Sequence, residues 1–124
     1  MGYLVREKAE APVVMSKCGE STRVLTADDT PVANLHVTHI RDSVKHYHRD
    51  CTEVYYVLSG SGSMELGDDV VELRPGVTVL IEPGTPHRAF GDLETIVFGV
   101  PAWRHTDEFY VVVDSDAEPA QAAR

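Results

Sequence analysis

Short strand-like segments divided by turn residues run through most of this chain of 124 residues. Each segment is rich in β-branched and aromatic residues, which favour strands. The predicted strands lie at 33–40, 52–60, 63–67, 69–73, 77–83, 86–90, 94–100 and 108–113. Pro-Gly pairs at 75–76 and 83–84 suit type II turns, and Gly60 and Gly62 are expected to flank the first hairpin. No segment keeps a helical period, so the pattern predicts an all-β sandwich or barrel.

Composition narrows the class of protein. The length fits one domain, and 43% hydrophobic with 25% charged residues is typical of a globular protein. Twenty acidic against 11 basic residues give a formal net charge of −9, which disfavours nucleic acid and anionic membranes as partners. No apolar run is long enough for a membrane span, and the charged first residues do not resemble a signal peptide. We therefore expect a cytoplasmic protein.

The ends of the chain differ in composition from its middle. Residues 1–12 are expected to form an N-terminal arm or an edge strand, and residues 13–113 a single barrel domain. Residues 114–124 are small, polar and acidic, so we expect a disordered tail.

Both faces of the predicted strand at 52–60 are largely apolar. Odd-numbered residues from Glu53 to Val57 share one face, and even-numbered residues from Val54 to Leu58 share the other. The outer face therefore needs a cover from the terminal segments or from another subunit. We expect a homodimer, the commonest closed oligomer.

A cluster of metal-binding residue types stands at the start of this strand. His46 and His48 are two residues apart, so in a strand both imidazoles point the same way. Glu53 follows after a short connection, and His87 follows a stiff Pro-Gly turn. Three imidazoles and one carboxylate suit one divalent transition metal ion per chain, which is Fe, Mn, Ni, Zn or Cu. A chance grouping of surface polar residues would leave the glutamate spacing and the rigid turn unexplained.

The spacing resembles the first motif of the cupin family. That motif contains a His-x-His pair, then glutamate after three or four residues, then glycine after six more. Here His46 and His48 are followed by four residues, Glu53, six residues and Gly60. Ile40 stands where the family often begins this motif with glycine.

The second motif of the family also has a counterpart. It contains glycine, five residues and a Pro-x-Gly-x-x-His run, and here Gly76 precedes the run from Glu82 to His87. Glu82 replaces the first proline of the run, and Gly91 stands where the family often has asparagine. None of the three departures is at a ligand position.

The resemblance covers about residues 20–113 and implies an all-β, double-stranded β-helix (jelly-roll) cupin barrel with the metal inside. The ligands that it implies are His46, His48, Glu53 and His87. The two motifs are also similar, more loosely, to those of small cupins related to mannose-6-phosphate isomerase.

Other residues are candidates for the pocket wall. Tyr55 shares the face of Glu53, and Cys51 lies between His48 and Glu53. His36 and His39 fall on opposite faces of one predicted strand, so at most one of them faces the interior. A second group of aromatic residues is expected in the core or in a subunit contact: Phe90, Phe98, Trp103, Phe109 and Tyr110.

These observations favour a small metal-dependent enzyme that acts on a small polar metabolite. Dioxygenase, isomerase, decarboxylase and lyase chemistry all remain open, because no second acid or base is identified by the sequence. One alternative is sugar isomerisation like that of the mannose-6-phosphate isomerase relatives. The other is a barrel that binds or senses a small molecule without turnover.

Overall fold

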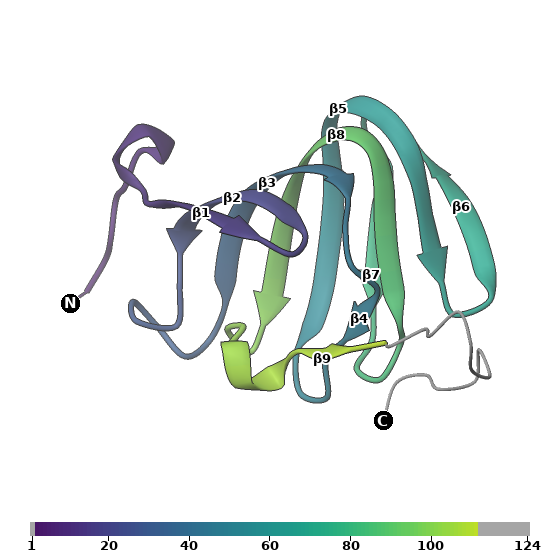
Figure 1. Cartoon of the computed structure of the whole chain (residues 1–124). Helices are drawn as coiled ribbons and strands as arrows, with labels where there is room; N and C mark the ends of the chain where they lie inside the picture. The colour runs from purple at the N-terminus through teal and green to yellow at the C-terminus, as the bar shows by residue number, and fades with distance from the viewer. Residues whose placement is uncertain (1, 112–124) are drawn as a thin grey trace.

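Nine antiparallel strands and two short 3-10 helices make up residues 2–111, the part of the chain that the computed structural model describes (Figure 1). The strands are β1 Val13–Ser16, β2 Gly19–Leu25, β3 Asn34–Asp42, β4 His46–Tyr47, β5 Thr52–Leu66, β6 Asp69–Leu73, β7 Thr78–Ile81, β8 His87–Val100 and β9 Phe109–Tyr110. The helices are η1 Lys8–Glu10 and η2 His105–Asp107.

The two longest strands organise the sheet. β5 and β8 pair along nearly their whole length, from Thr52 opposite Val100 to Leu66 opposite His87. β3 pairs with β8 between Phe90 and Gly99, while β4 pairs with β8 at His87. The sheet therefore curls back on itself, as Figure 1 shows, and the predicted all-β jelly-roll fold is confirmed.

The structure corrects the predicted strand boundaries around the glycines. Segments 52–60 and 63–67 form one strand, β5, and segments 86–90 and 94–100 form one strand, β8. Gly60 and Gly62 do not flank a hairpin. They let β5 and β8 approach closely, because a Cβ would lie 2.0 Å from the Asp92 carbonyl oxygen at Gly60 and 2.1 Å from that of Phe90 at Gly62.

Strands β1 and β2 were not predicted from the sequence. β2 carries polar side chains where a core strand would carry apolar ones, and Ser21 and Arg23 line a pocket instead of the core. The apolar alternation that marks a strand is absent for this reason.

The apolar core comes from β3 and from β5 to β8. Its buried members include Ile40, Met64, Leu73 and Leu93. The predicted faces of β5 are confirmed, since Glu53, Tyr55 and Val57 are buried while Tyr56 and Leu58 are exposed. Buried polar side chains gather instead on β2 and β3, and this end of the barrel contains the site.

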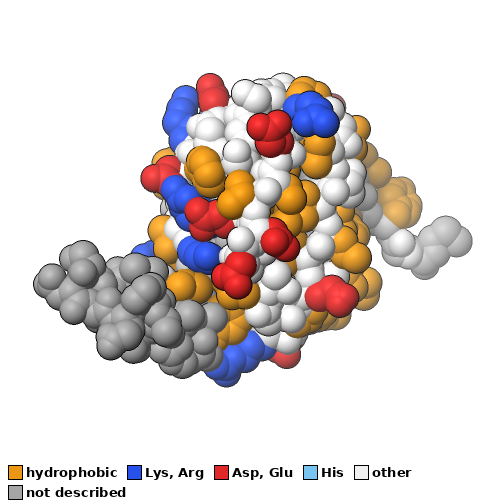
Figure 2. Space-filling model, turned by 90° about the vertical axis from the view of Figure 1, so that its right-hand side faces the viewer, with side chains coloured by type: hydrophobic (Ala, Val, Ile, Leu, Met, Phe, Trp, Pro, Cys, Tyr) orange, Lys and Arg blue, Asp and Glu red, His pale blue; other side chains and the backbone are white. Residues whose placement is uncertain are grey.

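The N-terminal residues 2–12 contain η1 and no strand. An ion pair between Arg6 and Asp29, 2.9 Å long, joins this arm to the loop after β2. The predicted tail at 114–124 lies outside the described residues. Among residues 2–111, no helix is long and apolar enough to cross a membrane. Hydrophobic and charged side chains are interspersed on the side of the molecule that Figure 2 shows.

Candidate metal centre

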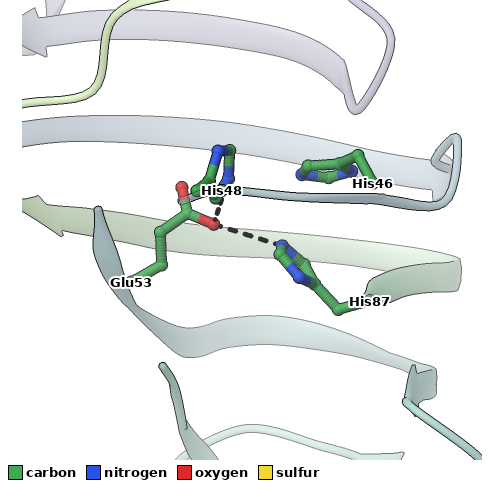
Figure 3. Close-up of side chains that lie close together, drawn as sticks. All are labelled: His46, His48, Glu53 and His87. Atoms are coloured by element: carbon green, nitrogen blue, oxygen red, sulfur yellow. Dashed lines mark ion pairs between the residues drawn. The ribbon is translucent and has the colours of Figure 1, made fainter. Parts of the chain in front are cut away.

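Four predicted ligand residues come together inside the barrel (Figure 3). His46 lies on β4 and His48 directly follows it, while Glu53 and His87 lie at the starts of β5 and β8. All four are buried, and one ligand atom from each lies within 4.8 Å of the others. The pairing of His46 with His87 across β4 and β8 brings the two sequence motifs together.

The main chain fixes the orientation of all three imidazoles. Nδ1 of His46 donates to the Val44 carbonyl at 2.7 Å, Nδ1 of His48 to Asp107 at 2.7 Å, and Nδ1 of His87 to Thr85 at 2.8 Å. A carbonyl oxygen can only accept, so each Nδ1 carries the hydrogen and each neutral ring presents a lone pair at Nε2. This is how metal-ligating histidines are usually held.

The Glu53 carboxylate completes the cluster. Its Oε1 lies 3.1 Å from Nε2 of His48 and 3.2 Å from Nε2 of His87. These distances are short enough for ion pairs, but none of the three buried atoms has a partner in hydrogen-bond geometry. Lone pairs and a carboxylate that face one another require a proton or a metal ion between them, and this donor set suits a transition metal ion.

The electrostatics of the cluster favour a negative carboxylate beside a cation. Burial disfavours charge on His48, but Glu53 outweighs this effect and raises the pKa of His48 to about 9. Burial and the neighbouring His87 lower the pKa of His46 to about 4. The pKa of Glu53 lies well below its usual value, although burial alone would raise it, because His48 and His87 bind the ionised form.

Asp107 supports the site from a distant part of the chain. Its carboxylate accepts hydrogen bonds from the backbone N–H groups of Arg49, Asp50 and Cys51, at 2.8 to 3.2 Å. Its own carbonyl holds His48. The last residue of η2 thus fixes both the loop after His48 and the ring of His48.

A pocket of about 260 Å³ opens beside the cluster, and His46 and Glu53 form part of its wall. Of the predicted pocket residues, Tyr55 and His36 line it. His39 is on the outer face, where it pairs with Asp92 and Glu94, so only one histidine of β3 faces the interior, as expected. Cys51 is buried outside the pocket wall, and its thiol donates to the Thr52 carbonyl.

The sequence did not identify several residues of the pocket wall. Trp103 and Tyr110 were expected in the core or in a subunit contact, but they line the pocket together with Glu108 and Arg23. Trp103 Nε1 and the Tyr110 hydroxyl both donate to Glu108. These residues follow no motif, and only the fold brings residues 103–110 against β2 and β3.

Comparisons with known proteins agree with the fold. The model of the cupin domain family matches residues 34–94, which include all four cluster residues. An uncharacterised protein of Methanocaldococcus jannaschii is 35% identical over 66 residues, which are 50% of this chain and 53% of that protein. The match thus spans about half the length of the curated relative.

Solved structures share the fold over nearly the whole chain. A protein from Planctomyces limnophilus is 26% identical with a TM-score of 0.81, and covers 89% of this chain and 97% of its own. Pac13 of Streptomyces, a nucleoside dehydratase, is 22% identical with a TM-score of 0.79, and the match covers 94% of this chain and 98% of Pac13. Ectoine synthase from P. lautus is 15% identical with a TM-score of 0.73, and the match covers 94% of this chain and 98% of the synthase. The fold neighbours thus include enzymes, and the family match with the shared jelly roll shows that this chain is a small cupin-domain protein.

Proposed function

We propose that this protein is a metal-dependent enzyme that converts a small polar molecule in the pocket beside His46 and Glu53. One observation carries the proposal. Three imidazoles are each fixed through Nδ1, and His48 and His87 turn Nε2 toward the buried carboxylate of Glu53 without hydrogen-bond geometry, in a cluster that borders a pocket. A purely structural cluster would not need to border a pocket.

The residues fit one divalent transition metal ion held by His46, His48, Glu53 and His87. Such an ion, when bound, supplies Lewis-acid chemistry, and O₂ chemistry as well if it is iron. A small polar ligand fits the pocket, because its volume of about 260 Å³ approaches that of ordinary small-molecule sites.

His36 favours proton-transfer chemistry within the enzyme classes that the sequence left open. Burial and the charge of Arg23 lower the pKa of His36 to about 4, so the imidazole in the pocket wall is neutral at pH 7. A neutral imidazole can accept a proton from a substrate, although its lowered pKa makes this one a weaker base than an ordinary histidine. Isomerase and lyase reactions commonly move a substrate proton, which a base in the pocket wall can accept. The nucleoside dehydratase among the fold neighbours is consistent with this preference.

Tyr55 is suited to holding a substrate or a proton at the deep end of the pocket. Burial and the nearby charge of Glu53 raise its pKa well above the usual value, so the phenol stays protonated. Its ring lies edge-on to His87, with the centroids 6.0 Å apart. A protonated phenol there can donate a hydrogen bond to a substrate oxygen.

The test is an activity screen with the purified chain. Sugar phosphates, nucleosides, hydroxy acids and oxo acids are incubated with protein loaded with Fe(II), Mn(II), Ni(II) or Zn(II), with and without O₂. We expect turnover that needs the ion, needs no O₂, and is lost in His87→Ala. His39→Ala removes a histidine from the outer face and should retain activity.

Turnover that survives both chelation and His87→Ala would contradict a metal-dependent enzyme. Saturable binding without turnover across the panel would favour the alternative of a binding or sensory barrel. Activity that requires O₂ would contradict the assignment of His36 as the base of an isomerase or lyase.

A further inference from the structure

Arg23 occupies an unusual position in the pocket wall. It lies on β2 directly opposite His36 of β3, and its guanidinium carbon is 5.0 Å from the ring centroid of Trp103. Trp103 is itself fixed, because its backbone N–H donates to Asn34 at 2.7 Å and its Nε1 donates to Glu108 at 3.1 Å. The guanidinium therefore rests on a rigid aromatic surface beside the pocket.

Arg23 has no carboxylate partner among residues 2–111. The other half-buried arginines of this part are paired, Arg6 with Asp29 at 2.9 Å and Arg88 with Glu65 at 3.0 Å. Arg23 makes no ion pair, and its buried Nε has no hydrogen-bond acceptor. A half-buried cation normally has a counter-charge, and the chain has a large excess of acidic residues to supply one.

The acidic groups of the pocket are engaged elsewhere. Glu53 faces His48 and His87, and Glu108 accepts from Trp103 and Tyr110. A second cation, Lys17, also lines the pocket, where its ammonium lies 4.9 Å from the ring centroid of Tyr110. The pocket thus has two cations on aromatic rings and two carboxylates that already face other groups, Glu53 the histidines of the cluster and Glu108 its two donors.

We infer that the substrate is a small anion whose carboxylate or phosphate group pairs with Arg23, while the rest of the molecule extends toward His46 and Glu53. The guanidinium fork matches both anion types, and Lys17 adds attraction for negative charge. This inference rests on the proposed function for the identity of the pocket as a substrate site. Anion binding at Arg23 does not itself need the metal.

The fluorescence of Trp103 reports the binding directly, because it is the only tryptophan of the chain. The metal-loaded protein is titrated at constant ionic strength with succinate, with inorganic phosphate and with neutral succinamide. We expect a saturable change with at least one anion and none with succinamide. Comparison of the succinate and phosphate titrations identifies which anion type the pocket prefers.

Variants assign the effect to Arg23. Arg23→Gln should weaken anion binding at least about tenfold, because a charge-assisted hydrogen bond and the local positive charge are both lost. Arg23→Lys keeps the charge, so its affinity for the anion should lie between that of the original chain and that of Arg23→Gln. Arg41→Gln removes an exposed charge outside this pocket and should bind like the original chain.

Each result decides the inference. If neither anion changes the fluorescence of the original protein, or if Arg23→Gln binds as tightly, the inference is overturned. The titrations are repeated with His87→Ala, which lacks a candidate ligand of the metal. If binding persists in His87→Ala and still depends on Arg23, the anion site is supported even if the metal proposal fails. If binding is lost in His87→Ala but retained in Arg23→Gln, the anion lies at the metal and the inference is overturned.

Discussion

The three imidazoles of the cluster share one anchoring pattern but differ in where the anchor comes from. His46 and His87 each donate to the carbonyl two residues before them, so short stretches of chain fix these rings. His48 donates to Asp107, which is 59 residues away. The position of His48 therefore depends on the packing of the segment around η2.

Replacing Asp107 with alanine should weaken metal binding without unfolding the protein. The change removes the acceptor for the N–H groups of Arg49, Asp50 and Cys51, so the loop that carries His48 loosens. Loss of such a supporting contact typically costs about 10- to 100-fold in metal affinity. Competition with a chelator measures it, and Asp50→Ala, whose exposed side chain lies in the same loop, is the control. Equal affinities for the two variants would show that the loop does not position His48.

Metal binding should strengthen as pH rises from about 7 to 9. Burial opposes the charge on His48, but Glu53 raises its pKa to about 9, so the metal-free site holds a proton that the ion must displace. The apparent Kd should fall about tenfold per pH unit in this window, with release of about one proton per ion. A chelator competition series across this range, with a pH indicator, tests both. Affinity that is constant above pH 7 would mean that His48 is already neutral there.

The metal-free protein should become less stable as pH rises, whereas its affinity for the metal increases. The pKa of His48 is raised on folding, so its contribution is fully present below the unfolded value near 6.5. This contribution is lost as pH rises through about 9. Urea unfolding of chelated protein at pH 6 and pH 9 provides the measurement.

At the scale of elements, the pairing of β5 with β8 depends on three glycines at one place. Gly60 and Gly62 of β5 lie against the main chain of β8, and Gly91 of β8 lies against β5. Added methyl groups would meet backbone atoms, which cannot move aside as a flexible side chain can. The close approach holds the register in which Glu53 lies opposite Gly99 and His87 opposite Leu66. These two ends of the ladder meet because the sheet curls back on itself, as Figure 1 shows.

Gly60→Ala should destabilise the fold much more than Gly76→Ala. Both residues have a positive φ, 88° and 91°, which costs an alanine about 1–2 kcal/mol. Only at Gly60 would the Cβ also meet a carbonyl oxygen, whereas nothing lies within 4 Å at Gly76. We expect a loss of about 3 kcal/mol or more at Gly60 and about 1–2 kcal/mol at Gly76. Equal shifts in urea unfolding would show that the contact is relieved by movement of the strands.

The sequence predicted the parts of the structure that local patterns encode. Alternation identified the buried face of β5, and two motifs identified the four cluster residues. The predicted end of a strand at Gly60 was wrong, because in the sequence a glycine that permits close contact between strands cannot be told from a glycine in a turn. Arg23, Trp103 and Asp107 could not be assigned, because their roles arise from contacts between distant segments and not from spacing.

At the scale of the whole molecule, one outer face of the sheet remains apolar. Tyr56 and Leu58 of β5, Leu80 of β7, and Phe98 and Val100 of β8 are exposed there. Val54 pairs with both Leu80 and Phe98, so these residues are neighbours on adjacent strands. An apolar face of this kind is typical of a contact between subunits.

We propose that this face or the N-terminal residues 1–14 form the interface of a homodimer. Light scattering at micromolar concentration should give about twice the chain mass of 13.7 kDa. Leu80→Glu should shift the protein toward the monomer if the face is used. Val70→Glu on β6 is a matched control, since the exposed fractions of the two side chains are 62% for Val70 and 64% for Leu80. A monomeric original chain would contradict the proposal.

The metal content of the protein, purified without chelators and then exposed to Fe(II), Mn(II), Ni(II) or Zn(II), tests the central claim most directly. Elemental analysis should find about one ion per chain in the original protein and in His39→Ala, whose imidazole lies on the outer face. His48→Ala and His87→Ala should retain almost none while circular dichroism still shows a folded β protein. An original chain that binds no ion, or a His87→Ala variant with full metal content, would contradict the account.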